Sequence, residues 1–162
     1  ATLAMGDALA VVLLQKKGFK TEDFARLHPG GSLGRKLTLR VEEVMVAEDY
    51  PSLGEDARMR DCIVPLARMR GTVPIVRNGG RVVGVVTAGD LTRLMERDPD
   101  FLEAPVREVM TRSPKLARVG ELASAAVHRM EEYGIMALPV VDEDTRLQGI
   151  VHLHDLMRSG AV

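Results

Sequence analysis

A glycine-rich loop at residues 28–34 carries the residue types that phosphate chemistry requires. Its sequence is His28-Pro29-Gly30-Gly31-Ser32-Leu33-Gly34, and the cations Arg35 and Lys36 follow it. Glycines let backbone amides approach a phosphate closely, and a histidine titrates near neutral pH, which suits proton transfer. The alternative is a hinge between two domains, where glycine-rich segments are also common.

Two aspartates, Asp90 and Asp155, stand 65 residues apart in similar surroundings, each at the expected start of a helix. A carboxylate there could accept hydrogen bonds from the hydroxyl groups of a ligand, and an arginine one turn later could pair with a phosphate. The flanking candidates at matching positions are Thr87 and His152, three residues before, and Arg93 and Arg158, three residues after. The alternative is structural, because aspartate is a good helix N-cap and arginines at such positions are commonly solvated.

The neighbours of the two aspartates differ. Gly89 is small where His154 is large, so the two sites are expected to be inequivalent. His152 and His154 would share one face of a strand, as metal ligands do, but no second ligand cluster accompanies them, and we predict no metal site and no cofactor. Met45 and Met110 complete the set of candidate ligand-binding residues, with packing in the core as their alternative role.

These matching positions belong to an internal repeat. Residues 73–91 align without a gap on residues 138–156, and Val41-Glu42-Glu43-Val44-Met45 matches Val106-Arg107-Glu108-Val109-Met110 at the same offset. Self-similarity at a fixed period indicates one unit used twice. We therefore divide the chain into residues 1–40, a first copy at 41–104 and a second copy at 105–162. Two copies predict one globule with pseudo-twofold symmetry and a cleft between its halves.

Each copy is predicted to be an α/β module. The segments 73–77 and 81–87 flank Asn78-Gly79-Gly80, a strong hairpin signal, since Asn-Gly supplies the positive φ angles of tight turns. Continuous β-branched runs predict strands buried on both faces. A helix over 119–133 is expected to end at Gly134. Pro65 interrupts the matching helix of the first copy and predicts a kink or a shorter helix there.

The first forty residues differ from the repeat. The segment from Leu3 to Leu14 is almost wholly apolar and predicts a helix of the kind found inside a large domain. A second, short helix from Thr21 should stop before Pro29. We expect the chain to begin inside another domain whose last helix it retains. The alternative is that this helix docks on the repeat or on a second subunit.

Composition narrows the functional classes. The chain has 162 residues, 46% of them hydrophobic, and a net charge of −1, which argues against binding of nucleic acid driven by overall charge. Its single cysteine, Cys62, excludes an internal disulfide and suits a reducing compartment. With no membrane-spanning stretch and no signal-peptide pattern, we expect a cytoplasmic protein that contacts no membrane.

The repeated elements resemble a tandem cystathionine-β-synthase (CBS) domain pair. The resemblance rests on the Val-x-x-Val-Met element, the hairpin, and the segments 84–91 and 149–156. With the N-terminal segments 2–10 and 23–34, the chain is similar to the bacterial D-arabinose 5-phosphate isomerases, which join a sugar-isomerase domain to a CBS pair. Those enzymes feed 3-deoxy-manno-octulosonate (Kdo) into lipopolysaccharide or capsule.

The resemblance implies a regulatory role. CBS pairs typically bind adenosyl or other nucleotides between the repeats, so Asp90 and Asp155 would accept hydrogen bonds from ribose. Activated Kdo is its cytidine monophosphate conjugate, CMP-Kdo, and we favour it as a feedback ligand, followed by adenine nucleotides. The alternative is a dimerisation module with an empty cleft. The resemblance also implies self-association, as a homodimer here and a tetramer in the full-length parent.

His28 matches an active-site histidine of that isomerase family. The other catalytic groups lie upstream, in sequence that this chain lacks. Isomerisation needs a base and a phosphate anchor, which one histidine cannot both supply. We predict no isomerase activity for this chain alone, and catalysis by His28 across subunits is the least favoured alternative.

Overall fold

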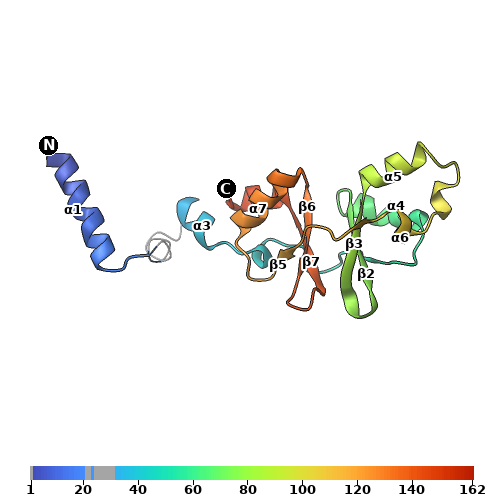
Figure 1. Cartoon of the computed structure of the whole chain (residues 1–162), viewed down its shortest axis with the longest axis horizontal. Coiled ribbons are helices and arrows are strands. Elements are labelled where there is room, and N and C mark those ends of the chain that lie inside the picture. Colours follow the sequence, from blue (N-terminus) through green and yellow to red (C-terminus); the bar gives the residue numbers. More distant parts are fainter. Residues whose placement is uncertain (1, 21–22, 24–31) are drawn as a thin grey trace.

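A computed structural model describes residues 2–20, 23 and 32–162 (Figure 1). The predicted N-terminal helix is α1 (Thr2–Lys16), and Gly18 after it has a φ of 61°. From Met5 to Leu14 its large apolar side chains are exposed, and α1 stands apart from the two sheets. The predicted second helix, His28 and most of the glycine-rich loop lie outside the described residues.

The two repeats use nearly the same elements in the same order. After α3 (Ser32–Thr38), the elements of the first repeat are η1 (Val41–Glu43), β1 (Leu53–Gly54), α4 (Met59–Arg68), β2 (Thr72–Arg77), η2 (Asn78–Gly80), β3 (Arg81–Thr87) and α5 (Ala88–Met95). Those of the second repeat follow η3 (Phe101–Glu103) and are α6 (Val106–Val109), β4 (Thr111–Arg112), β5 (Ala117–Arg118), α7 (Ala123–Tyr133), β6 (Ala137–Val141), β7 (Leu147–His152) and α8 (Leu153–Ser159).

Each repeat centres on an antiparallel hairpin. The sheets have the orders β1-β2-β3-β4 and β5-β6-β7. Strand β2 pairs with β3 and β6 pairs with β7, with a register shift at Ile75/Val76 in one hairpin and at Val140/Val141 in the other. These bulges are related by the 65-residue offset. The α/β class and the predicted hairpin at 73–87 are confirmed, and Gly79 and Gly80 supply its positive φ angles.

The helices end where local chemistry predicts, with one exception. Gly134 closes α7 in the left-handed conformation, at φ 63°. Helix α4 continues through Pro65 and ends at Arg68, which the 65-residue offset matches to Tyr133 at the end of α7, so the proline neither breaks the helix nor shortens it. The proline's missing N–H would have bonded to the carbonyl of Asp61 in the first turn of α4.

The first segment of each repeat packs on the other repeat. Val41 is fully buried in a core cluster with α7, β6 and β7, and Val106 in a cluster with α4, β2 and β3. The Val46 N–H donates to the Ile150 carbonyl at 2.8 Å and the Ile150 N–H donates back at 3.1 Å. Strand β4 pairs with β3 in the same way. The two modules therefore exchange their leading segments, which ties them into one body.

No helix in the described part of the chain is both long enough and apolar enough to cross a membrane.

Candidate functional site

A cleft of about 490 Å³ opens where the two repeats meet. Four segments form its wall: the end of α4 and the start of β2, the end of β3 with the start of α5, the loop after β4, and the turn from α7 into β6. The residues that line it are Arg70, Gly71, Thr72, Val85, Thr87, Ala88, Gly89, Thr111, Ser113, Pro114, Lys115, Gly134, Ile135, Met136, Ala137 and Pro139. The cleft predicted from the repeat is therefore present beside one of the two predicted half-sites.

The charged groups of this cleft are cations. Arg70 and Lys115 line it, and no aspartate or glutamate is among the described residues that do so. The Lys115 ammonium lies 3.9 Å from the centroid of the Tyr133 ring, a cation–π distance that places its charge beside the mouth. Hydroxyl groups of Thr87, Thr111 and Ser113 add hydrogen-bonding capacity. The cleft is suited to an anion that also presents an apolar face.

Thr87 and Asp90 hold each other at the start of α5. The Asp90 carboxylate accepts hydrogen bonds from the Thr87 backbone N–H at 2.8 Å and from its hydroxyl at 2.7 Å, while the Thr87 hydroxyl accepts from the Asp90 N–H at 3.3 Å. This is a capping box. Arg93 pairs with the other carboxylate oxygen. The structural role weighed for Asp90 is thus present, and its contact with a ligand stays a prediction.

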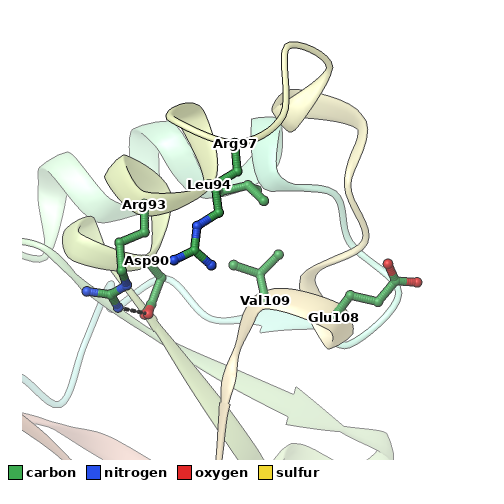
Figure 2. Close-up of a pocket in the computed structure, with 6 residues that line it drawn as sticks. All are labelled: Asp90, Arg93, Leu94, Arg97, Glu108 and Val109. Carbon is green, nitrogen blue, oxygen red and sulfur yellow. Dashed lines mark hydrogen bonds and ion pairs between the residues drawn. The ribbon is translucent and has the colours of Figure 1, made fainter.

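Asp90 and Arg93 line a second, smaller cavity rather than the cleft (Figure 2). It measures about 210 Å³ and lies between α5 and α6. In Figure 2 the Arg97 guanidinium extends toward Val109, whereas Glu108 points away. Of the two first-repeat candidates that flank Asp90, only Thr87 reaches the cleft.

The candidates of the second repeat, His152, His154, Asp155 and Arg158, lie outside the cleft. His152 is 5% exposed, and its Nε2 lies 3.2 Å from the Met69 carbonyl oxygen. Its Nδ1 is buried, has no hydrogen-bond partner, and lies 3.8 Å from Asp155. Asp155 pairs with Arg70 at 2.9 Å. His154 and Arg158 are exposed on α8. None of the four is among the residues that line the cleft.

Met45 and Met110 lie over glycines of the hairpin strands. Met110 contacts Gly84 and Met45 contacts Gly149, two pairs related by the 65-residue offset. Both methionines are partly buried against the core clusters. Neither lines the cleft, so the packing role is present and their ligand contact stays a prediction.

Sequence patterns missed Arg70 and Lys115. Arg70 follows α4 with a φ of 51°, and the 65-residue offset sets it against the apolar Ile135. That mismatch was the available signal for Arg70. Lys115 lies in an irregular loop, and the 65-residue offset matches it to Tyr50. This pair too sets a charged residue against an uncharged one. Within the described ranges, no group of three His, Cys, Asp or Glu side chains is placed to hold a metal ion.

Comparison with known proteins identifies the family. The CBS domain family matches residues 41–97 and 106–161. The chain belongs to the CBS domain family. Over its full length it is 43% identical to the arabinose 5-phosphate isomerase KdsD of Yersinia pestis and 41% identical to that of Escherichia coli K12. The chain spans about half the length of these curated relatives, at 50% of each.

Solved structures, one of them a CBS domain pair, share the fold. The CBS pair of protein MJ0100, in complex with 5′-methylthioadenosine and S-adenosyl-L-methionine, has a TM-score of 0.65 at 24% identity and covers 75% of this chain and 94% of its own. CBSX2 in complex with AMP has a TM-score of 0.65 at 23% identity, with 74% and 94% covered. The cytosolic domain of the Mg²⁺ channel MgtE in complex with ATP has a TM-score of 0.62 at 26% identity, with 74% and 48% covered.

Proposed function

We propose that the chain is the regulatory part of an arabinose 5-phosphate isomerase and that its CBS pair binds a nucleotide or sugar nucleotide in the cleft. One observation carries the proposal: a cleft of about 490 Å³ holds two cations and no described carboxylate. Its volume falls within the range of about 300–1,000 Å³ that small-molecule sites occupy. The similarity to MgtE, which is in complex with ATP, supports the same class of ligand.

The charge of the cleft favours phosphates over cationic ligands. Arg70 and Lys115 would attract a phosphate, whereas they would repel the sulfonium of S-adenosylmethionine. CMP-Kdo carries one phosphodiester and one carboxylate, and either could pair with Lys115, while Arg70 already pairs with Asp155. We favour CMP-Kdo as the feedback ligand of the Kdo pathway, followed by adenine nucleotides. Ligand binding would then change the geometry of the catalytic domain, which follows if it binds one conformation better than another.

Calorimetric titration of the chain with CMP-Kdo, AMP, ATP and S-adenosylmethionine tests this proposal. The decisive variant is Lys115→Met, which removes one cation at the mouth. We expect it to raise the Kd for a bound nucleotide about tenfold, which corresponds to about 1.4 kcal/mol.

Arg118→Met is the matched control. Arg118 is exposed on β5, which pairs with the hairpin end of β6, away from the cleft, and its side chain makes no ion pair with a described carboxylate. Its Kd should equal that of the unmodified chain. Equal weakening by both variants would show a general charge effect, and absence of binding by all four compounds would refute the nucleotide site.

A second candidate function is self-association through the helices of the first repeat. Ile63 and Val64 on α4 are 44% and 66% exposed, and Met95 on α5 is 53% exposed. Large apolar side chains exposed on adjoining helices would form an interface if they lie together on the surface. Sedimentation equilibrium would detect the homodimer. Thermal stabilisation by a nucleotide separates the two functions, because an added nucleotide raises the melting temperature only if the folded chain binds it.

A further inference from the structure

The two half-sites hold side chains of different size at equivalent positions. Each residue that lines the open cleft beside Thr87 has an equivalent in the other repeat, 65 residues later or earlier in the chain. The equivalents that do not themselves line the cleft belong to the half-site around His152. Four pairs show the difference, with the cleft residue first: Gly134 and Met69, Val85 and Ile150, Ala88 and Leu153, Gly89 and His154. In each pair the residue of the second half-site is larger. The difference between Gly89 and His154 noted in the sequence is thus one of four that run in this direction, whereas Met136 of the cleft matches the smaller Gly71.

Two of these larger side chains, those of Met69 and Ile150, pack in the second half-site, whereas His154 is exposed. Met69 is 5% exposed, Ile150 is fully buried and Ala137 is 8% exposed, and the three form a core cluster with Val46 and Tyr50 packed against it. Tyr50 corresponds to Lys115 of the open cleft, and its hydroxyl donates to the Leu147 carbonyl at 3.3 Å. The space that a ligand would occupy in the open half-site is therefore filled by side chains in the other.

The polar groups of the second half-site are also engaged. Asp155 pairs with Arg70 at 2.9 Å. The Nε2 of His152 lies 3.2 Å from the Met69 carbonyl oxygen. Arg70 also lines the open cleft, so one side chain belongs to the wall of the first half-site and neutralises the carboxylate of the second. A ribose entering beside Asp155 would have to displace this ion pair and the packed Met69 side chain.

We propose that the chain binds one anionic ligand, in the half-site at Thr87. The half-site at His152 is filled by packed side chains and takes no ligand. This inference rests on the proposed nucleotide-binding function. It adds a stoichiometry of one per chain, in a fold whose twofold symmetry allows two.

Titration calorimetry on the full chain with AMP and with CMP-Kdo tests the stoichiometry. We expect a single transition with one ligand per chain. Two ligands per chain, or half a ligand per chain, would overturn the inference while leaving nucleotide binding intact. No binding by either compound would overturn both the inference and the proposed function.

A reciprocal exchange locates the ligand. Gly89→His places the larger residue at the open cleft, where an added Cβ meets nothing closer than the Arg93 side chain at 3.3 Å, and should weaken binding at least tenfold. His154→Gly removes an exposed side chain beside the closed half-site but leaves Met69, Ile150 and Tyr50 packed, and should leave one ligand per chain. A second ligand would show that these packed side chains do not close the half-site and would overturn the inference.

Methyl NMR gives a readout that does not depend on the variants. Met136 lines the open cleft and is 62% exposed, whereas Met69 is packed in the closed half-site. Intermolecular NOEs from the base or ribose protons of AMP to the Met136 methyl support the inference, and NOEs to the Met69 methyl overturn it.

Discussion

Gly149→Ala and Gly84→Ala occupy equivalent positions of the repeat and should nevertheless differ strongly in stability. An added Cβ at Gly149 would lie 2.6 Å from the Val46 carbonyl oxygen, which belongs to the backbone and cannot move alone. An added Cβ at Gly84 would lie 2.6 Å from the Met110 sulfur, which a flexible side chain can withdraw, and 3.0 Å from the Thr111 carbonyl oxygen. The first clash must displace backbone, whereas most of the second can be relieved by a rotamer change.

The expected loss in the free energy of unfolding follows from the contacts that each clash disrupts. Val46 and Ile150 exchange two backbone hydrogen bonds, of 2.8 and 3.1 Å, and such bonds contribute about 0.5–1.5 kcal/mol each. Overpacking costs about 1–3 kcal/mol, and replacing glycine by alanine returns about 0.4–1 kcal/mol through the unfolded chain. We expect Gly149→Ala to lower the free energy of unfolding by about 2–4 kcal/mol, and Gly84→Ala by about 1 kcal/mol or less.

Urea unfolding followed by circular dichroism measures both values. Gly54→Ala is the control, because an added Cβ at Gly54 has no atom within 4 Å. Adding Met110→Ala should remove most of the penalty of Gly84→Ala, whereas Met45→Ala should not rescue Gly149→Ala. Equal destabilisation by the two glycine variants, or rescue of Gly149→Ala by Met45→Ala, would refute the account of the exchanged segments.

Two further predictions concern titrating side chains. Burial raises the pKa of the Cys62 thiol to about 11 from 9.0, so iodoacetamide should alkylate it slowly at pH 8 unless urea is present, and the free energy of unfolding should fall between about pH 9 and 11 as only the unfolded chain ionises. The hydrogen bonds from Arg77, of 2.5 and 2.7 Å, hold the pKa of the Glu55 carboxyl below 4.5. The stability from this pair should therefore persist above pH 4.5 and be lost as the pH falls through the lowered pKa, and acid titration of Glu55→Gln should lack that loss.

Local sequence signals predicted the local structure well. The Asn78-Gly79-Gly80 turn and Gly134 after α7 lie where the sequence predicts a hairpin and a helix end, because their φ angles depend mainly on the residues themselves. Pro65 was harder to interpret. Its effect on α4 depends on packing of Cys62 and Leu66 in the core, which maintains the helix across the missing hydrogen bond.

Long-range contacts could not be predicted in the same way. The repeat predicts two similar modules, but the exchange of Val41 and Val106 between them depends on which sheet each segment meets in space. Similarly, the alignment shows that Gly89 and His154 differ, but not that Met69 and Tyr50 fill the space beside His152. Arg70 joins the two half-sites only because the fold brings the end of α4 to the start of α8.

The exchanged segments explain why the asymmetry of the half-sites can have consequences beyond the cleft. Val46 and Thr111 are equivalent positions: Thr111 lines the open cleft, and Val46 packs against the closed half-site. Val46 follows the segment of the first repeat that packs on the second, and Thr111 follows the segment of the second repeat that packs on the first. A ligand that moves the Thr111–Lys115 loop would therefore act on β3 of the first repeat, with which β4 pairs, through a segment of the second repeat. The closed half-site is filled by the packed side chains of Met69 and Ile150, with Tyr50 against them, and offers no comparable freedom. Motion on ligand binding should therefore be concentrated in the open half-site, on one side of the pseudo-twofold axis, and should displace the Thr111–Lys115 loop more than its equivalent in the closed half-site.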